Sequence, residues 1–271
     1  MSGFGLSVHA QYSELGLFIG GTNYKGELSH QLFNDKFINL GVGGFFRHNW
    51  TRHWGYRLQL NYGKIQADDQ QGDHFWQLQR NLNFESKIVE FSYLLEFNFL
   101  PYEVGNREYA FTPFLNSGLT LFHFNPKAIR GDDKIELQPL GTEGQLIADD
   151  RTYRRLAVAF PIGGGIKFNI GQMGVSLEVA ARRSYTDYLD DVHGAYADPV
   201  QLLVNNGPLT ASLADRSIIP SDTGLVYPRL VNKMRGTPND KDWYVFGGIT
   251  LSFRLSSVMR EICLPFKRRR Y

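Results

Sequence analysis

The 271-residue sequence has one cysteine, Cys263, and no long hydrophobic segment. A single cysteine excludes an internal disulfide framework and disfavours a cysteine-rich metal site. The absence of any run of about 18 apolar residues excludes a transmembrane helix. The sequence also lacks an excess of one charge, because the net charge is +2 at pH 7. Composition therefore gives no indication of nucleic-acid binding.

Helical periodicity is also nearly absent, and alternation of apolar and polar residues takes its place. On the segment Ser86–Phe99, Val89 and Phe91 share one face, whereas Glu90 and Ser92 share the other. This alternation predicts eight strands, at Glu14–Asn23, Phe37–His48, Trp54–Gln66, Ser86–Phe99, Phe111–Phe124, Leu156–Ile170, Gly174–Tyr185 and Asp242–Leu255. A mean hydropathy of −0.30 fits a soluble β-sandwich or a membrane β-barrel, whose lumen and loops are polar.

The lengths of strands and connections favour the barrel over the sandwich. The predicted strands run for about 10 to 14 residues, whereas soluble strands average about 5 to 6 and tilted membrane strands need about 9 to 11. Short links at 49–53 and 171–173 and an intermediate link at 100–110 alternate with long ones. The long links cover 24–36, 67–85, 125–155 and 186–241. Outer-membrane barrels have short periplasmic turns and long external loops. We therefore predict an all-β, eight-stranded antiparallel transmembrane β-barrel of the cell outer membrane, with its apolar face against lipid.

Charged residues on the polar faces of these strands are predicted to fill the lumen. They are Arg57, Glu90, Glu96, Lys167, Glu178, Arg182 and Arg254. Because eight strands leave only enough room for side chains, buried charges have to pair. We expect an ion-pair network that plugs the barrel rather than a narrow channel.

Aromatic residues near the strand ends fit interfacial girdles, namely Tyr12, Trp50, Trp54, Tyr56, Tyr102, Tyr109 and Trp243.

Three regions follow from this pattern. Residues 1–10 end in Val8-His9-Ala10, with small residues where a signal peptidase requires them. We interpret them as the remnant of an export signal, with an ordinary N-terminus as the alternative. Residues 11–255 form the predicted barrel. Residues 256–271 form a basic periplasmic tail, with its charges at Lys267, Arg268, Arg269 and Arg270, suited to anionic lipid or an acidic partner.

Two features are candidate sites of chemistry. The segment Ser184–Pro199 places four carboxylates close together, at Asp187, Asp190, Asp191 and Asp198. Such a group could hold calcium, but its spacing is not that of an EF-hand. We interpret it as a loop whose Asp side chains bind backbone amides.

Four histidines could serve a lipid-modifying enzyme at the barrel rim, namely His48, His74, His123 and His193. None lies in a motif with a nucleophilic serine, so we predict no enzyme, cofactor or metal.

Several segments carry a resemblance to a known family. The stretches YSELGLFIGGTNYKGELS and RRSYTDYLDDVHGAYADP, with the last strand, are similar to the PorG-like outer-membrane barrels of the type IX secretion system. The second motif includes Asp187, Tyr188, Asp190 and Asp191. The long insertions at 125–155 and 201–241 depart from the family pattern. The resemblance implies a non-enzymatic component that anchors the periplasmic ring, through its lipoprotein subunit, for protein secretion and possibly gliding motility.

The expected docking surface lies on the periplasmic side. Its candidate residues are Arg52, Tyr102 and Arg107 in the shorter links and Lys267, Arg268, Arg269 and Arg270 in the tail. Two other functions stay open. One is a surface adhesin or defence barrel that acts through its external loops. The other is a lipid-modifying enzyme, which would need a histidine close to a serine or carboxylate at one rim.

Overall fold

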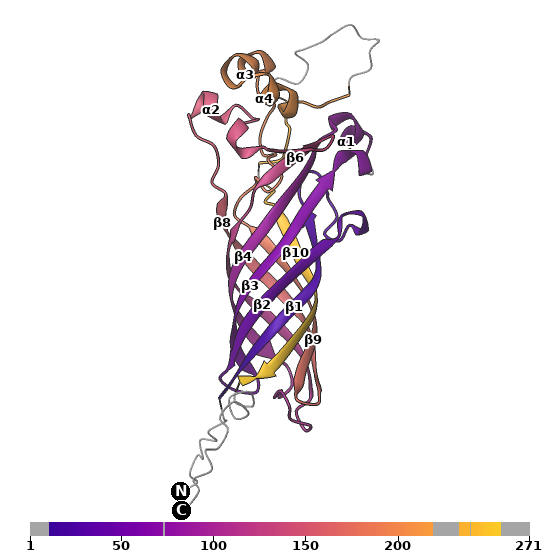
Figure 1. The fold of residues 1–271 in the computed structure, drawn as a ribbon, viewed down its shortest axis with the longest axis vertical. Helices are drawn as coiled ribbons and strands as arrows, with labels where there is room; N and C mark the ends of the chain where they lie inside the picture. The colour runs from indigo at the N-terminus through magenta and orange to yellow at the C-terminus, as the bar shows by residue number, and fades with distance from the viewer. Residues whose placement is uncertain (1–10, 73, 219–232, 239, 256–271) are drawn as a thin grey trace, which may run out of the picture.

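A computed structural model describes residues 11–72, 74–218, 233–238 and 240–255 of the chain (Figure 1). Eight long strands of 11 to 16 residues form the body of the molecule. They are β1 (Tyr12–Lys25), β2 (Asn39–Asn49), β3 (Trp54–Asp68), β4 (Asn83–Asn98), β5 (Phe111–His123), β8 (Leu156–Ile170), β9 (Met173–Ser184) and β10 (Trp243–Arg254). All eight predicted strands are present, with ends shifted by three residues or fewer.

These strands close into an antiparallel barrel. Around the ring the order is β3, β2, β1, β10, β9, β8, β5 and β4, and β4 pairs with β3 to complete it. The last strand pairs with the first along their length, from Glu14 opposite Arg254 to Lys25 opposite Trp243. Closure leaves no strand edge with unpaired amides and carbonyls, which hydrocarbon would not tolerate. The predicted fold class is confirmed.

The two ends of the barrel differ greatly. At one end, here called the short-turn end, strands are joined by residues 50–53, 99–110 and 171–172. At the other, the loop end, the chain forms additional elements (Figure 1). These are η1 (Asp35–Phe37), η2 (Asp69–Gln71), α1 (Phe75–Arg80), β6 (Pro126–Arg130), β7 (Asp133–Glu136), η3 (Gln138–Leu140), α2 (Gln145–Ala148), α3 (Pro199–Asn206) and α4 (Pro208–Ala214). The hairpin of β6 and β7 extends from β4 and was not predicted. In the described part of the chain, no helix has the length and apolar character needed to cross a membrane.

The outer wall of the barrel is apolar. Large side chains project outward and are exposed on every barrel strand. They include Leu15, Leu17, Ile19, Leu40, Val42, Leu60, Tyr62, Val89, Phe91, Leu95, Leu115, Leu119, Leu121, Val158, Phe160, Ile162, Leu177, Val179, Ile249 and Leu251. The residues that alternate with them, such as Glu90, Ser92 and Thr250, are buried inside. The barrel thus has its apolar side outside and its polar side inside, as the alternation predicted.

Glycines let the wall pack tightly where strands meet. Gly165 on β8 lies opposite Glu178 on β9. A Cβ atom built at Gly165 would overlap the carbonyl oxygen of Leu177. The run of glycines at 163–165 therefore serves close strand contact rather than phosphate binding.

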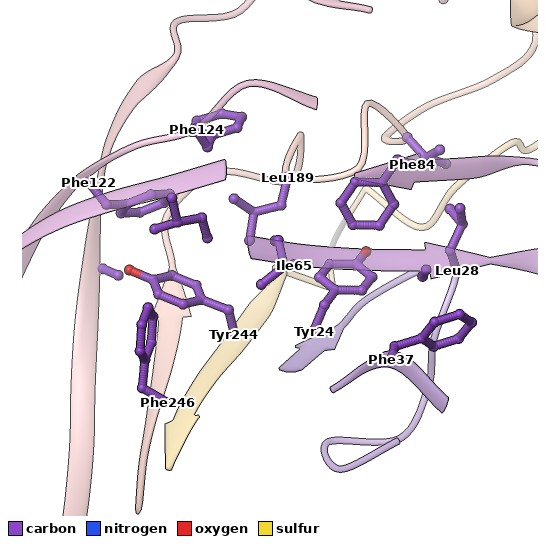
Figure 2. Close-up of a cluster of buried hydrophobic side chains, with 14 of the residues drawn as sticks. Tyr24, Leu28, Phe37, Ile65, Phe84, Phe122, Phe124, Leu189, Tyr244 and Phe246 are labelled. Carbon is purple, nitrogen blue, oxygen red and sulfur yellow. The ribbon is translucent and has the colours of Figure 1, made fainter. Parts of the chain in front are cut away.

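Aromatic side chains fill the half of the lumen nearest the loops. The buried cluster includes Phe18, Tyr24, Ile65, Phe84, Phe122, Phe124, Leu189, Tyr244 and Phe246. Figure 2 shows side chains of this cluster, among them Tyr24, Phe84 and Tyr244, converging from several strands and from the loop that carries Leu189. The Tyr24 and Phe84 rings meet edge to face, with centroids 4.8 Å apart. The sequence did not indicate this aromatic half of the plug.

Part of the predicted aromatic girdle was wrong. Trp50 and Trp54 are exposed near the short-turn end, as a girdle requires. Tyr12 and Tyr102 are buried instead, and the Tyr12 hydroxyl donates a hydrogen bond to the carbonyl oxygen of Tyr102. These two tyrosines pack with Val104 beneath the barrel, because link 99–110 folds across its opening.

Candidate functional site

The half of the lumen nearest the short turns contains a network of ion pairs. Glu96 on β4 lies at its centre. Its Oε1 is 2.7 Å from Arg47 Nε, its Oε2 is 3.4 Å from Arg57 Nε, and Lys167 Nζ also contacts Oε1. All four side chains are almost completely buried. One carboxylate cannot neutralise three cations, so the network needs further acids.

Two more glutamates supply the missing charge, and a third balances another buried cation, Arg182. Arg57 Nη1 is 2.7 Å from Glu178 Oε2, and Arg47 Nη1 is 2.8 Å from Glu14 Oε2. Arg182 Nη2 lies 2.8 Å from Glu90 Oε1. The Tyr244 hydroxyl donates to Glu90 and thereby joins the ion pairs to the aromatic cluster. The network contains four basic and four acidic groups, so it places no net charge in the lumen and avoids an unpaired buried ion.

Six of the seven predicted lumen residues lie in this network, namely Arg57, Glu90, Glu96, Lys167, Glu178 and Arg182. Arg254 is different. It lies at the short-turn end, where its Nη1 is 2.9 Å from Glu103 Oε1, and a quarter of its side chain is exposed. Glu14 and Arg47 belong to the network but were missed, because glycines on β1 and β2 obscured which face was polar.

The short-turn end presents a mixed polar surface, formed by residues 50–53 and 99–110. Arg52 is 3.2 Å from Glu103 and its guanidinium lies 3.9 Å from the centroid of the Tyr109 ring. Arg107 is exposed at the tip of the link. Tyr102 corrects the prediction for this surface. It is only 2% exposed and donates to Asn169 Oδ1 at 2.8 Å, so it closes the barrel and is unavailable to a partner. The tail residues Lys267, Arg268, Arg269 and Arg270 fall outside the described residues.

The acidic motif lies at the loop end and is largely buried. Asp190 Oδ1 accepts a hydrogen bond from the Val192 amide at 2.9 Å, an Asp-to-backbone contact of the predicted kind. Asp191 accepts from the Tyr153 hydroxyl at 2.7 Å, and burial raises the pKa of its carboxyl to about 6. The Tyr188 ring stacks on Tyr153 with centroids 4.4 Å apart. The motif thus fixes the long loop after β9 to the loop after β5.

Two of the candidate histidines each have one of the neighbours that an enzyme at the barrel rim would need. His48 Nδ1 is 2.9 Å from Ser13 Oγ near the short-turn end. His193 Nδ1 is 2.6 Å from Asp187 Oδ2 at the loop end. A triad requires a nucleophile, a base and an orienting acid together. In the described part of the chain, His48 has a serine without an acid, and His193 has an acid without a serine.

Geometry therefore defines a class: an eight-stranded β-barrel with an apolar exterior and a lumen closed by ion pairs and aromatic rings. Residues 4–203 match the family model described as Domain of unknown function (DUF6089), and the chain belongs to this family. Comparison with the curated proteins gives no match.

Several solved structures resemble the chain. Ail of Yersinia pestis is 9% identical, with a TM-score of 0.41 over 91% of this chain and 99% of that one. The N-terminal β-barrel domain of Pseudomonas aeruginosa OprF is 12% identical, with a TM-score of 0.36 over 90% and 98%. The outer membrane protein OprG of Pseudomonas aeruginosa is 10% identical, with a TM-score of 0.38 over 90% and 98%. These likenesses concern the fold alone.

Proposed function

We propose that this protein is an integral barrel of the bacterial outer membrane and that it acts as a non-enzymatic scaffold. The single observation that carries the membrane assignment is the exposed apolar wall. Leu17, Leu60 and Leu119 are 68%, 57% and 59% exposed in mid-barrel. Monomeric soluble proteins rarely expose apolar patches beyond a few hundred Å². A bilayer removes that cost because hydrocarbon solvates the wall.

The closed lumen supports a scaffold rather than a pore. Arg57 and Glu178 meet across the inside, and the aromatic cluster occupies the rest of its length. A conducting barrel would need a continuous water-filled path lined by polar groups. Here the charges neutralise one another instead, which gives a rigid body whose two ends can present binding surfaces.

We further infer that the barrel is a component of the type IX secretion machinery and, in gliding bacteria, serves motility. It would anchor the periplasmic ring through the ring's lipoprotein subunit. The support is the sequence resemblance of residues 12–29 and 182–199, together with the form of the short-turn end. Arg52, Glu103 and Arg254 brace that surface, and Arg107 projects from it.

A pair of charge reversals tests which end binds. The variant Arg107→Glu changes the short-turn end, and the matched control Arg130→Glu makes the same exposed change at the loop end. Affinity capture from gently solubilised outer membrane should recover ring subunits with the native protein. Arg107→Glu should lower that recovery at least threefold, and Arg130→Glu should leave it unchanged. If the native protein captures no ring subunit, the secretion role is wrong.

A surface-binding role is the second candidate, and one observation favours it. Helix α3 exposes Val200, Leu203 and Val204 at the loop end. An apolar face of this kind suits a surface ligand. The capture experiment separates the two roles, because an adhesin would lose its ligand on substitution of Val204→Asp and keep it in Arg107→Glu.

A further inference from the structure

Three carboxylates from distant parts of the sequence meet at the loop end. Glu27 follows β1, Asp187 follows β9 and Asp242 immediately precedes β10. Each places a carboxylate oxygen within 4.8 Å of the others. Because β9, β10 and β1 are consecutive around the barrel, their loop-end residues are forced together. The exposed fractions are 6% for Glu27, 2% for Asp187 and 0% for Asp242.

Two oxygens of this cluster are buried and have no hydrogen-bond partner. They are Glu27 Oε2 and Asp187 Oδ1. The second oxygen of each carboxylate is satisfied, since Glu27 Oε1 accepts from the Thr237 amide at 3.2 Å and Asp187 Oδ2 contacts His193. A buried carboxylate oxygen without a donor carries a large desolvation penalty. Two such atoms in one cluster indicate a missing positive ligand.

The neighbouring cations of the protein do not fill this position. Arg80 gives its Nε and Nη2 to Asp69, at 2.7 and 2.8 Å, and reaches only the main-chain oxygen of Glu27. Lys241 directs its Nζ to the carbonyl oxygen of Pro238 at 3.4 Å.

The rest of the surroundings add negative charge and fix the ligands. The Tyr24 hydroxyl lies 2.7 Å from Asp190 Oδ2 and 3.0 Å from Asp242 Oδ1, so a fourth carboxyl borders the group. Asp240 adds negative charge near Asp187, and Lys241 adds positive charge there. Asp242 Oδ2 accepts from the Leu189 amide at 3.0 Å, and His193 orients Asp187 in the way that outer-shell partners orient metal ligands.

We propose that Glu27, Asp187 and Asp242 bind a Ca²⁺ ion at the loop end of the barrel. The three candidate ligands are hard carboxylate oxygens, which calcium prefers, and the one described imidazole in contact with them, that of His193, binds Asp187 Oδ2. Calcium takes oxygen ligands at about 2.3–2.6 Å in a flexible geometry, and oxygens that all lie within 4.8 Å of one another can surround such an ion. Bound calcium would join the loops after β1 and β9 to the start of β10. This inference is independent of the secretion role.

Calorimetric titration of the purified, detergent-solubilised protein with Ca²⁺, after removal of metals with EDTA, tests the site. We expect one Ca²⁺ per chain with a Kd on the order of 10⁻⁴–10⁻³ M, as in extracellular modules. Glu27→Gln and Asp187→Asn should each weaken binding at least tenfold. Asp132→Asn, an exposed change in the β6–β7 hairpin, should bind as the native protein does. Unchanged binding in Glu27→Gln and Asp187→Asn, or tighter binding of Mg²⁺ than of Ca²⁺, would overturn the proposal.

A second measurement on the native protein covers the case in which the variants do not fold. Calcium should slow hydrogen exchange of the Leu189 and Val192 amides at least fivefold, because their acceptors are Asp242 and Asp190. Amides of the short-turn end should not change. Equal exchange of Leu189 and Val192 with and without Ca²⁺ would also overturn the proposal.

Discussion

Arg57 on β3 and Glu178 on β9 form an ion pair across the lumen, with 2.7 Å between Nη1 and Oε2. Three strands separate β3 from β9 in either direction around the ring. The pair therefore spans the full width of the barrel. A salt bridge across the diameter fixes opposite walls to each other and leaves no open path at that level.

The first prediction concerns the centre of the ion-pair network. Glu96→Gln should destabilise the folded barrel by about 3–5 kcal/mol, because it leaves Arg47, Arg57 and Lys167 with an uncompensated buried charge. Chemical unfolding in detergent measures the change. The control Glu108→Gln, an exposed position in the link after β4, should stay within about 0.5 kcal/mol of the native protein. Equal stability of the two variants would show that the network is not energetically important.

The second prediction concerns conduction. The native protein in planar bilayers should show no stable ion current, because ion pairs and the aromatic cluster block the lumen. Conductances like those of porins, which need an aqueous channel, should be absent across applied voltages. A reproducible unitary current that depends on this protein would contradict the plugged lumen.

The third prediction uses depth along the outer wall. Leu60→Arg in the middle of β3 should lower the free energy of unfolding in a bilayer by about 2–4 kcal/mol. Trp54→Arg at the short-turn end of the same strand should lower it by only about 0–1 kcal/mol. Both native side chains are exposed, at 57% and 48%. Unfolding from lipid vesicles measures the difference. Equal costs at the two depths would mean that the wall does not cross hydrocarbon.

The fourth prediction concerns pH at the loop end. Burial raises the pKa of Asp191 from 3.8 to about 6. A raised carboxyl pKa stabilises the folded loop at low pH, and this contribution is lost as the pH rises through about 6. Asp191→Asn cannot ionise, and Asn tolerates the positive φ of 68° at this position. Between pH 4 and pH 8, the free energy of unfolding of the variant should therefore rise by roughly 2–3 kcal/mol relative to that of the native protein.

Hydrogen exchange of the amides at 188–192, compared at the same pH, checks this shift. The intrinsic effect of pH on exchange cancels in the comparison between the two proteins. A difference between Asp191→Asn and the native protein that stays constant with pH would rule out a titrating Asp191.

Much of the barrel was predictable because alternation with period two is a local signal. It located all eight barrel strands and placed Glu90, Glu96 and Lys167 inside. Glycines at 16, 20, 41 and 43 carry no polarity, so the inward positions of Glu14 and Arg47 could not be read from β1 and β2. Alternation along the last strand also places Tyr244 and Phe246 on the inner face, but it does not indicate the aromatic cluster that they join.

The loop end was the least predictable region. The β6–β7 hairpin and helices α1 to α4 are short, and short elements give weak periodic signals. The group of Glu27, Asp187 and Asp242 joins residues that are more than 50 positions apart in the chain. Only the ring order of β9, β10 and β1 brings these residues together. The sequence clusters Asp187 with Asp190 and Asp191 and gives no sign of its contact with Glu27 and Asp242.

The membrane assignment requires hydrocarbon, and not water, outside the barrel. Single-cysteine variants Leu60→Cys and Leu251→Cys, made with Cys263 replaced by serine and labelled with a fluorophore, report that medium in reconstituted vesicles. Asp132→Cys in the exposed β6–β7 hairpin is the control. We predict that lipid-borne quenchers reduce the fluorescence of the two wall positions and that aqueous quenchers reduce only the control. Aqueous quenching of Leu60→Cys and Leu251→Cys to the level of the control would contradict a membrane-spanning wall.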